Sequence, residues 1–168
     1  MTFVQVVAPS PQATRAVLIF AAAVATLLVV WIFQWMGYQP CELCLTERIA
    51  FYVGAPLAAL TALLAGRNAH RLAQAGFVLL ALAFLANAIL AFYHVGVEYH
   101  WWAGPTACTG ALGGSVDVND MMKELNSVRI ARCDEAQLWI FGLSLAAWDV
   151  VASAALAIFA ATAARLER

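Results

Sequence analysis

The sequence LAQAGFVLLALAFLANAILAFY, residues 72–93, determines the fold class of this chain. The stretch contains no charged side chain, and its polar members are Gln74 and Asn87. An α-helix needs about 20 mostly apolar residues to cross the hydrocarbon core of a bilayer. We therefore predict a transmembrane helix over residues 72–93.

Three more apolar runs of similar length predict spans at about residues 16–35, 45–65 and 140–163. Hydrophobic residues make up 64% of the sequence and charged residues 11%, whereas about a quarter of a soluble domain is charged. The first run continues well past the small residues that a signal peptidase would need, so we interpret it as a span. The sequence predicts one domain over residues 1–168, an all-α integral membrane four-helix bundle. Its net charge of −1 argues against a nucleic-acid partner.

The connections between these spans alternate between two sides of the membrane. The termini and the loop at residues 66–71 share one side, and residues 37–44 and 94–137 share the other. The short segments of the first side carry Arg15, Arg67, Arg71, Arg165 and Arg168. Because Lys and Arg concentrate on the cytoplasmic side, we expect both termini in the cytoplasm. All four cysteines, Cys41, Cys44, Cys108 and Cys133, then lie on the opposite face, where disulfides persist.

The Cys41-Glu42-Leu43-Cys44 motif precedes the second predicted span. Pro40 suits the first position of a helix, and a helix N-terminus favours a thiolate. Arg48 follows Cys44 by four residues, on the same helical face, where its charge can support a thiolate or hold a polar ligand. Alternatively, Glu47 and Arg48 are interfacial charges whose side chains extend to water.

A CxxC pair by itself leaves two kinds of chemistry open. Redox exchange is one, and a Cys₄ zinc site that adds Cys108 and Cys133 is the other. The 25-residue separation of these two cysteines is unusual for a zinc knuckle. A c-type haem is excluded in its usual form because Leu45 stands where the CxxCH motif needs histidine.

The long outer segment, residues 94–137, opens with several polar and aromatic side chains. His94, Glu98 and His100 are candidates for proton transfer near the membrane edge, or alternatively are solvated loop residues. We interpret the tryptophans at 101 and 102 as anchors in the head-group region.

Apolar residues then recur at helical spacing over residues 116–128, which predicts a short amphipathic helix on the membrane surface. Asp149 is a carboxylate within the fourth span. We expect it to form hydrogen bonds to Ser153 or to another span, for example at Asn87, and rank this above a proton-relay role.

The sequence YQPCELCLTER, residues 38–48, resembles the quinone-proximal motif of DsbB-type disulfide bond formation proteins. Residues 96–108 and 133–148 are also similar to this family, and so is the order of the four spans and two outer segments. The resemblance therefore covers most of the chain.

This resemblance implies a protein-dithiol:quinone oxidoreductase of the bacterial inner membrane. We expect the protein to be a monomer. A reduced periplasmic thioredoxin-fold oxidase of the DsbA type would attack a Cys108–Cys133 disulfide and form a mixed disulfide with Cys108. Exchange with the Cys41–Cys44 pair, through a Cys41–Cys133 bond, would follow. Cys44 would then deliver electrons to ubiquinone or menaquinone, supported by Arg48, with no metal ligands expected.

Two residues depart from this picture. Glu42 places a negative charge between the cysteines, where it opposes thiolate formation, and Asp149 has no assigned role in the family mechanism. The alternatives that stay open are a paralogue dedicated to one specialised substrate oxidase and a Cys₄ metal-binding membrane protein.

Overall fold

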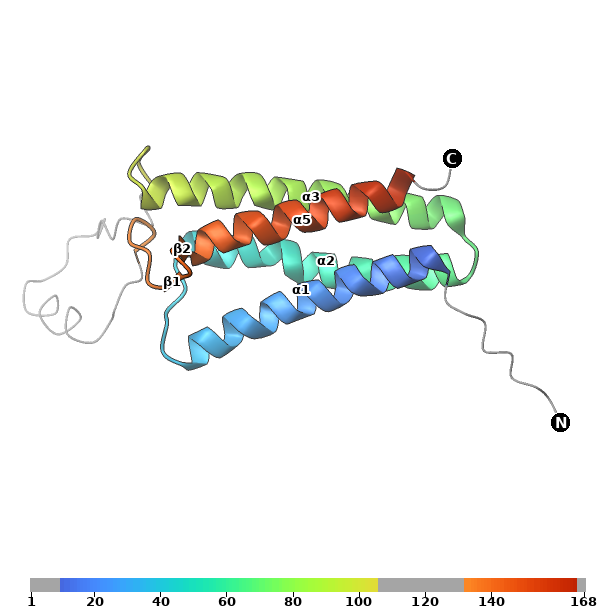
Figure 1. Ribbon diagram of the computed structural model, residues 1–168, viewed down its shortest axis with the longest axis horizontal. Coiled ribbons are helices and arrows are strands. Elements are labelled where there is room, and N and C mark those ends of the chain that lie inside the picture. Colours follow the sequence, from blue (N-terminus) through green and yellow to red (C-terminus); the bar gives the residue numbers. More distant parts are fainter. Residues whose placement is uncertain (1–9, 106–131, 166–168) are drawn as a thin grey trace, which may run out of the picture.

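Four long helices form the bundle in a computed structural model of the chain, which describes residues 10–105 and 132–165. They are α1 (Pro11–Trp35), α2 (Glu42–Gly66), α3 (His70–Glu98) and α5 (Leu145–Arg165). The helices lie side by side along one axis (Figure 1). Each of them is long and apolar enough to cross a membrane. The predicted all-α membrane four-helix bundle is therefore confirmed.

The connections gather at the two ends of the bundle (Figure 1). The α1–α2 link, the end of α3 and a short hairpin before α5 lie at one end, while the α2–α3 link and the end of α5 lie at the other. The first end therefore collects Cys41, Cys44 and Cys133, as the predicted alternation of connections requires.

Helix α3 is longer than the predicted span and ends only at Glu98. His94 and Glu98 consequently belong to a helix, and the prediction that they open an outer loop at residue 94 is wrong. The helix continues because its last turns still bury residues against the bundle: His94 is 2% exposed and Val97 is 1% exposed. The chain leaves the helix at His100, whose φ of 59° is left-handed.

Helix α5 begins at Leu145, and the predicted start of the fourth span at residue 140 is wrong. The residues before it form an antiparallel hairpin of β1 (Trp139–Ile140) and β2 (Leu143–Ser144). Its two turn residues, Phe141 and Gly142, have φ of 51° and 80°, as a two-residue hairpin turn of the primed type requires. An apolar run alone does not reveal this turn. The amphipathic helix predicted at residues 116–128 lies outside the described residues.

Small residues allow α2 and α3 to pack closely. Gly54 faces the ring of Phe84, and Gly76 faces Thr61, so that a Cβ on either glycine would overlap the neighbouring helix. Such small residues at crossings are typical of helices packed in lipid, where apolar burial gives no driving force between helices.

Hydrogen bonds join α3 to α5 within the membrane. The amide of Asn87 donates to Asp149 Oδ2 at 3.0 Å and to Ser153 Oγ at 2.9 Å, and Ser153 donates to Asp149 Oδ1 at 3.1 Å. Gln74 donates to the carbonyl oxygen of Ala164 at 3.0 Å, near the other end of the pair. The predicted hydrogen bonding of Asp149 to Ser153 and Asn87 is confirmed.

The Gly76→Ala variant should lower the stability of the bundle, because its methyl group would collide with Thr61 on α2. Overpacking of this kind costs about 1–3 kcal/mol. The measurement is the midpoint of thermal unfolding in detergent. The control is Gly66→Ala, where a Cβ meets nothing within 4 Å. Equal midpoints for the two variants would contradict the proposed close contact.

Candidate redox site

A disulfide between Cys41 and Cys44 lies at the start of α2. Cys41 is the N-cap of the helix, and its Sγ accepts a hydrogen bond from the backbone N–H of Cys44 at 3.1 Å. The helix begins at Glu42, so the prediction that Pro40 occupies the first helical position is wrong. A sulfur at an N-cap lies in the positive field of the helix terminus, which stabilises a thiolate once the disulfide is reduced.

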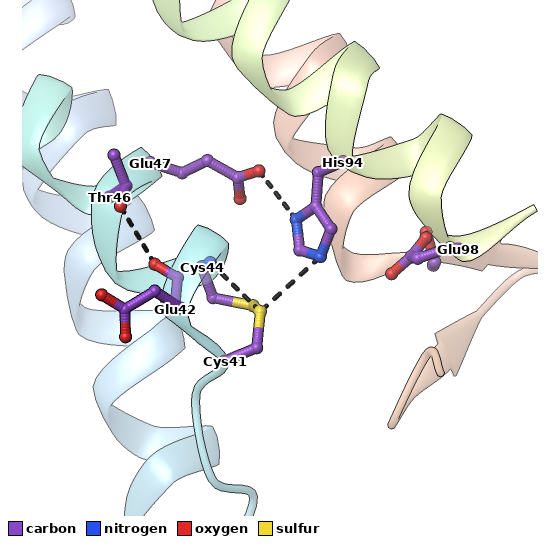
Figure 2. The surroundings of a disulfide bond; sticks show 8 residues. Cys41, Glu42, Cys44, Thr46, Glu47, His94 and Glu98 are labelled. Carbon is purple, nitrogen blue, oxygen red and sulfur yellow. Dashed lines mark hydrogen bonds and ion pairs between the residues drawn. A yellow bond between two sulfur atoms is a disulfide. The ribbon is translucent and has the colours of Figure 1, made fainter. Parts of the chain in front are cut away.

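His94 connects this disulfide to Glu47 (Figure 2). The Nε2 atom of His94 lies 3.6 Å from Cys41 Sγ, and its Nδ1 atom lies 2.8 Å from Glu47 Oε1. His94 is 2% exposed and Glu47 is 6% exposed. The alternative that Glu47 extends to water is therefore wrong. An imidazole that a buried carboxylate orients against a sulfur can accept or return the thiol proton.

Cys133 is 1% exposed and packs in one buried cluster with Cys41, Leu43 and Val97. It is also disulfide-bonded, and Cys108 lies outside the described residues. The segment that carries Cys133 thus reaches the inner pair, although 89 residues separate Cys44 from Cys133 in the sequence.

The residues on either side of Cys133 form an ion pair. Arg132 donates two hydrogen bonds to Asp134, at 2.9 and 2.7 Å. The guanidinium group lowers the pKa of the Asp134 carboxyl group below its usual value. The ion pair therefore flanks Cys133 on both sides.

A cavity of about 160 Å³ lies beside the disulfide and is bordered by all four helices. Cys44 and Arg48 line it, and Arg48 donates a hydrogen bond to Gln34 on α1 at 2.8 Å. The apolar part of the lining includes Leu27, Val30, Phe33 and Phe51. An apolar cavity of about 150 Å³ can hold a benzene ring, so this one fits a ring-shaped head group whose polar atoms face Arg48.

Two carboxylates from other helices also line the cavity. Glu98 accepts a hydrogen bond from Ser144 at 2.5 Å, and Asp149 accepts from Asn87. His100 is exposed and does not line the cavity, so the structure separates it from His94 and Glu98.

The tryptophans at 101 and 102 pack on the outer end of α3. Trp102 stacks on Tyr93 at 5.8 Å between ring centroids, covers Gly96, and donates a hydrogen bond to the carbonyl oxygen of Tyr93. Trp101 is 58% exposed. An indole ring with one solvent-exposed edge is typical of the membrane interface.

The Cys₄ alternative finds no support in the described residues, because Cys41 and Cys44 are bonded to each other. Among these residues, the group that could hold a metal ion is instead Cys41, Cys44 and His94. The sequence missed this grouping and the Glu47–His94 pair. The one sequence signal was His94, a histidine at the end of an apolar run. Nothing in the sequence indicated that its partner would be Glu47.

Four spanning helices with a disulfide at their edge, beside a buried Glu–His pair, define a membrane protein of the thiol–disulfide oxidoreductase class. Comparisons with known proteins narrow this class. The family model described as disulfide bond formation protein DsbB matches residues 12–163. The chain therefore belongs to the DsbB family.

A curated relative is disulfide bond formation protein B of Herminiimonas arsenicoxydans. The two are 28% identical over 156 residues, which cover 84% of this chain and 89% of the relative. No solved structure matches the chain.

The Glu47→Gln and His94→Gln variants should show coupled effects on stability, because each residue is the buried partner of the other. Contacting residues in one hydrogen-bonded pair couple by about 0.5–3 kcal/mol. A double-mutant cycle of unfolding free energies in detergent measures this coupling. Arg132→Gln with Asp134→Asn, a pair in which Arg132 is exposed, provides the control and should couple less. Additive effects at Glu47 and His94 would refute the pairing.

Proposed function

We propose that this protein reoxidises a periplasmic thioredoxin-fold oxidase of the DsbA type and transfers the electrons to a membrane quinone. The observation that carries the proposal is the disulfide bordering a ring-sized cavity that also contains Arg48. Membership of the DsbB family supports the same reaction. Overall, the partner's dithiol becomes a disulfide, and two electrons and two protons pass to the quinone. The alternative of a paralogue that serves one specialised oxidase shares this chemistry.

The outer half of the relay is the Cys108–Cys133 disulfide in this proposal. A thiolate of the reduced partner attacks Cys108 and displaces the thiolate of Cys133. That thiolate then attacks Cys41, and Cys44 leaves as a thiolate. The partner's second thiolate attacks the mixed disulfide and displaces Cys108, which releases the oxidised partner. The Cys108 thiolate then attacks Cys133 and displaces Cys41, which restores the outer disulfide. The burial of Cys133 beside Cys41 supports this exchange, since sulfur attack requires close approach.

The inner half ends at Cys44. A quinone bound in the cavity would accept electrons from the Cys44 thiolate and be reduced to the quinol. Arg48 stabilises the Cys44 thiolate and binds a carbonyl oxygen of the head group. His94, held by Glu47, takes the proton from Cys41 as this thiol returns to the disulfide. The proposal covers either ubiquinone or menaquinone as the electron acceptor.

The proposed location is the bacterial inner membrane, with both termini in the cytoplasm and the cysteines on the periplasmic side. The Arg-rich short segments at the end opposite the disulfide support this orientation. We propose a monomer as the working unit because one chain contains both cysteine pairs.

The decisive test is reconstitution of the purified protein in vesicles with a quinone and a reduced thioredoxin-fold oxidase. Partner thiols should disappear as quinol forms, in equal amounts, and Cys44→Ser should abolish both. Absence of partner oxidation by the intact protein would refute the proposed function.

The Arg48→Ala variant should lower kcat/KM for quinone by roughly 10–100-fold, since a hydrogen bond to a charged group contributes about 1.5–3 kcal/mol. The assay is quinol formation at varied quinone concentration. The control is Arg67→Ala, which removes an exposed arginine at the opposite end of the same helix. A similar loss in both variants would contradict a specific role for Arg48.

In the Cys133→Ser variant, the free Cys108 thiolate should attack the disulfide of the oxidised partner and form a mixed disulfide. This adduct should accumulate because Cys133 is not there to displace the partner from Cys108. Non-reducing electrophoresis after mixing with the oxidised partner measures the adduct. Cys108→Ser is the matched control and should form none. Trapping by the control, or by neither variant, would overturn the assignment of Cys108.

A further inference from the structure

Three side chains that bind soft metal ions meet at the start of α2. The sulfurs of Cys41 and Cys44 and the Nε2 atom of His94 all lie within 4.8 Å of one another. In the disulfide the sulfurs are bonded together, and neither can act as a thiolate ligand. Reduction converts the disulfide to two thiols beside an imidazole nitrogen.

The distances suit tetrahedral coordination. Zinc binds thiolate at about 2.3 Å and imidazole at about 2.0–2.1 Å, which places the two donor atoms roughly 3.5 Å apart. Cys41 Sγ and His94 Nε2 are 3.6 Å apart. Cys-x-x-Cys spacing, with Cα atoms 5.1 Å apart here, is also the usual spacing of a zinc-binding pair.

Glu47 supplies the second observation. Its carboxylate lies 2.8 Å from His94 Nδ1, the ring nitrogen that faces away from the sulfurs (Figure 2). Metal-binding histidines almost always donate their other N–H to such a partner, which orients the ring and increases its basicity. The carboxylate–histidine part of a metal site is therefore already assembled in the oxidised protein.

We infer that the reduced protein, and not the oxidised protein, binds one soft divalent cation such as Zn²⁺ or Cd²⁺ through Cys41, Cys44 and His94. Two thiols and the cation give a dithiolate complex and two released protons, so no electrons are exchanged. The paired thiolates neutralise the ion, which suits a site at the membrane edge. Cys133 in the same buried cluster can supply a fourth ligand, as can water.

Metal binding has a functional consequence, which rests on the proposed function. A dithiolate held by the cation cannot reform the disulfide, so the ion blocks delivery of electrons to quinone. Inhibition then depends on the redox state: the ion enters only after the inner disulfide has been reduced. The ion is therefore an inhibitor of the relay and not a resident cofactor.

The test uses the full-length protein in detergent, without quinone or partner, and Cd²⁺ as the probe. A Cys108→Ser/Cys133→Ser double variant keeps only the proposed thiols. It is reduced with a phosphine that is then removed, and is titrated under anaerobic conditions. We expect one Cd²⁺ per protein, seen as thiolate-to-metal absorption, with release of two protons. The oxidised double variant should bind none.

Variants in this background identify the ligands. Glu47→Gln should weaken Cd²⁺ binding by about 10–100-fold, as loss of a carboxylate partner does at other metal sites. His94→Ala should weaken it further, and exposed His100→Ala should leave it unchanged. Undiminished binding in His94→Ala, equal binding to the oxidised protein, or no binding to the reduced protein would each overturn the inference.

A second measurement separates this inference from the proposed function. Wild-type protein in quinone vesicles should lose partner oxidation when it is reduced and loaded with Cd²⁺, and recover it with a chelator. Cd²⁺ binding without any quinone-dependent oxidation would refute the proposed function alone. Oxidation that continues with Cd²⁺ bound would refute the inhibition.

Discussion

The redox end of this bundle depends on one buried contact, between Glu47 on α2 and His94 on α3. Both side chains are more than nine-tenths buried, so each needs a polar partner within the protein. That requirement fixes the register of the two helices. Because the imidazole is held at Nδ1, its other nitrogen meets Cys41 at the helix start. The position of the disulfide relative to α3 follows from this contact.

The same requirement determines how α3 meets α5. Asn87 satisfies Asp149 and Ser153 together, and Gln74 satisfies a backbone carbonyl near the far end of the helix pair. Helix α3 therefore carries polar contacts to both neighbours, while glycine at the α2 crossing allows close approach. Helix α1 joins α2 through Trp31, which donates to the Tyr52 hydroxyl, and through the amide of Gln34, which accepts from Arg48 at the cavity. It borders the cavity and also packs Ala16, Ile19 and Ala23, all fully buried, into the core of the bundle.

The sequence was sufficient for the four spans because apolar runs of this length have few other uses. It was insufficient at the ends of the spans. The polar residues His94 and Glu98 suggested a loop but belong to α3, and the apolar residues before Leu145 suggested a helix but form a hairpin. The pairing of Asp149 was predictable because few polar groups compete within a span. The Glu47–His94 pair was not, since it joins residues 47 positions apart and no periodicity connects them.

The two sulfurs of the inner disulfide have different surroundings, and this asymmetry bears on the direction of the proposed relay. Cys41 is 3% exposed, accepts the N–H at the helix start, and packs against His94 and Cys133. Cys44 is less buried and lines the cavity together with Arg48. A sulfur that exchanges with another cysteine of the same chain reacts more readily when it is buried in contact with that cysteine and lies beside a base. A sulfur that serves a lipid-soluble acceptor must instead face the acceptor's cavity. The helix N-terminus satisfies both needs because it holds the two sulfurs together while directing them toward different partners.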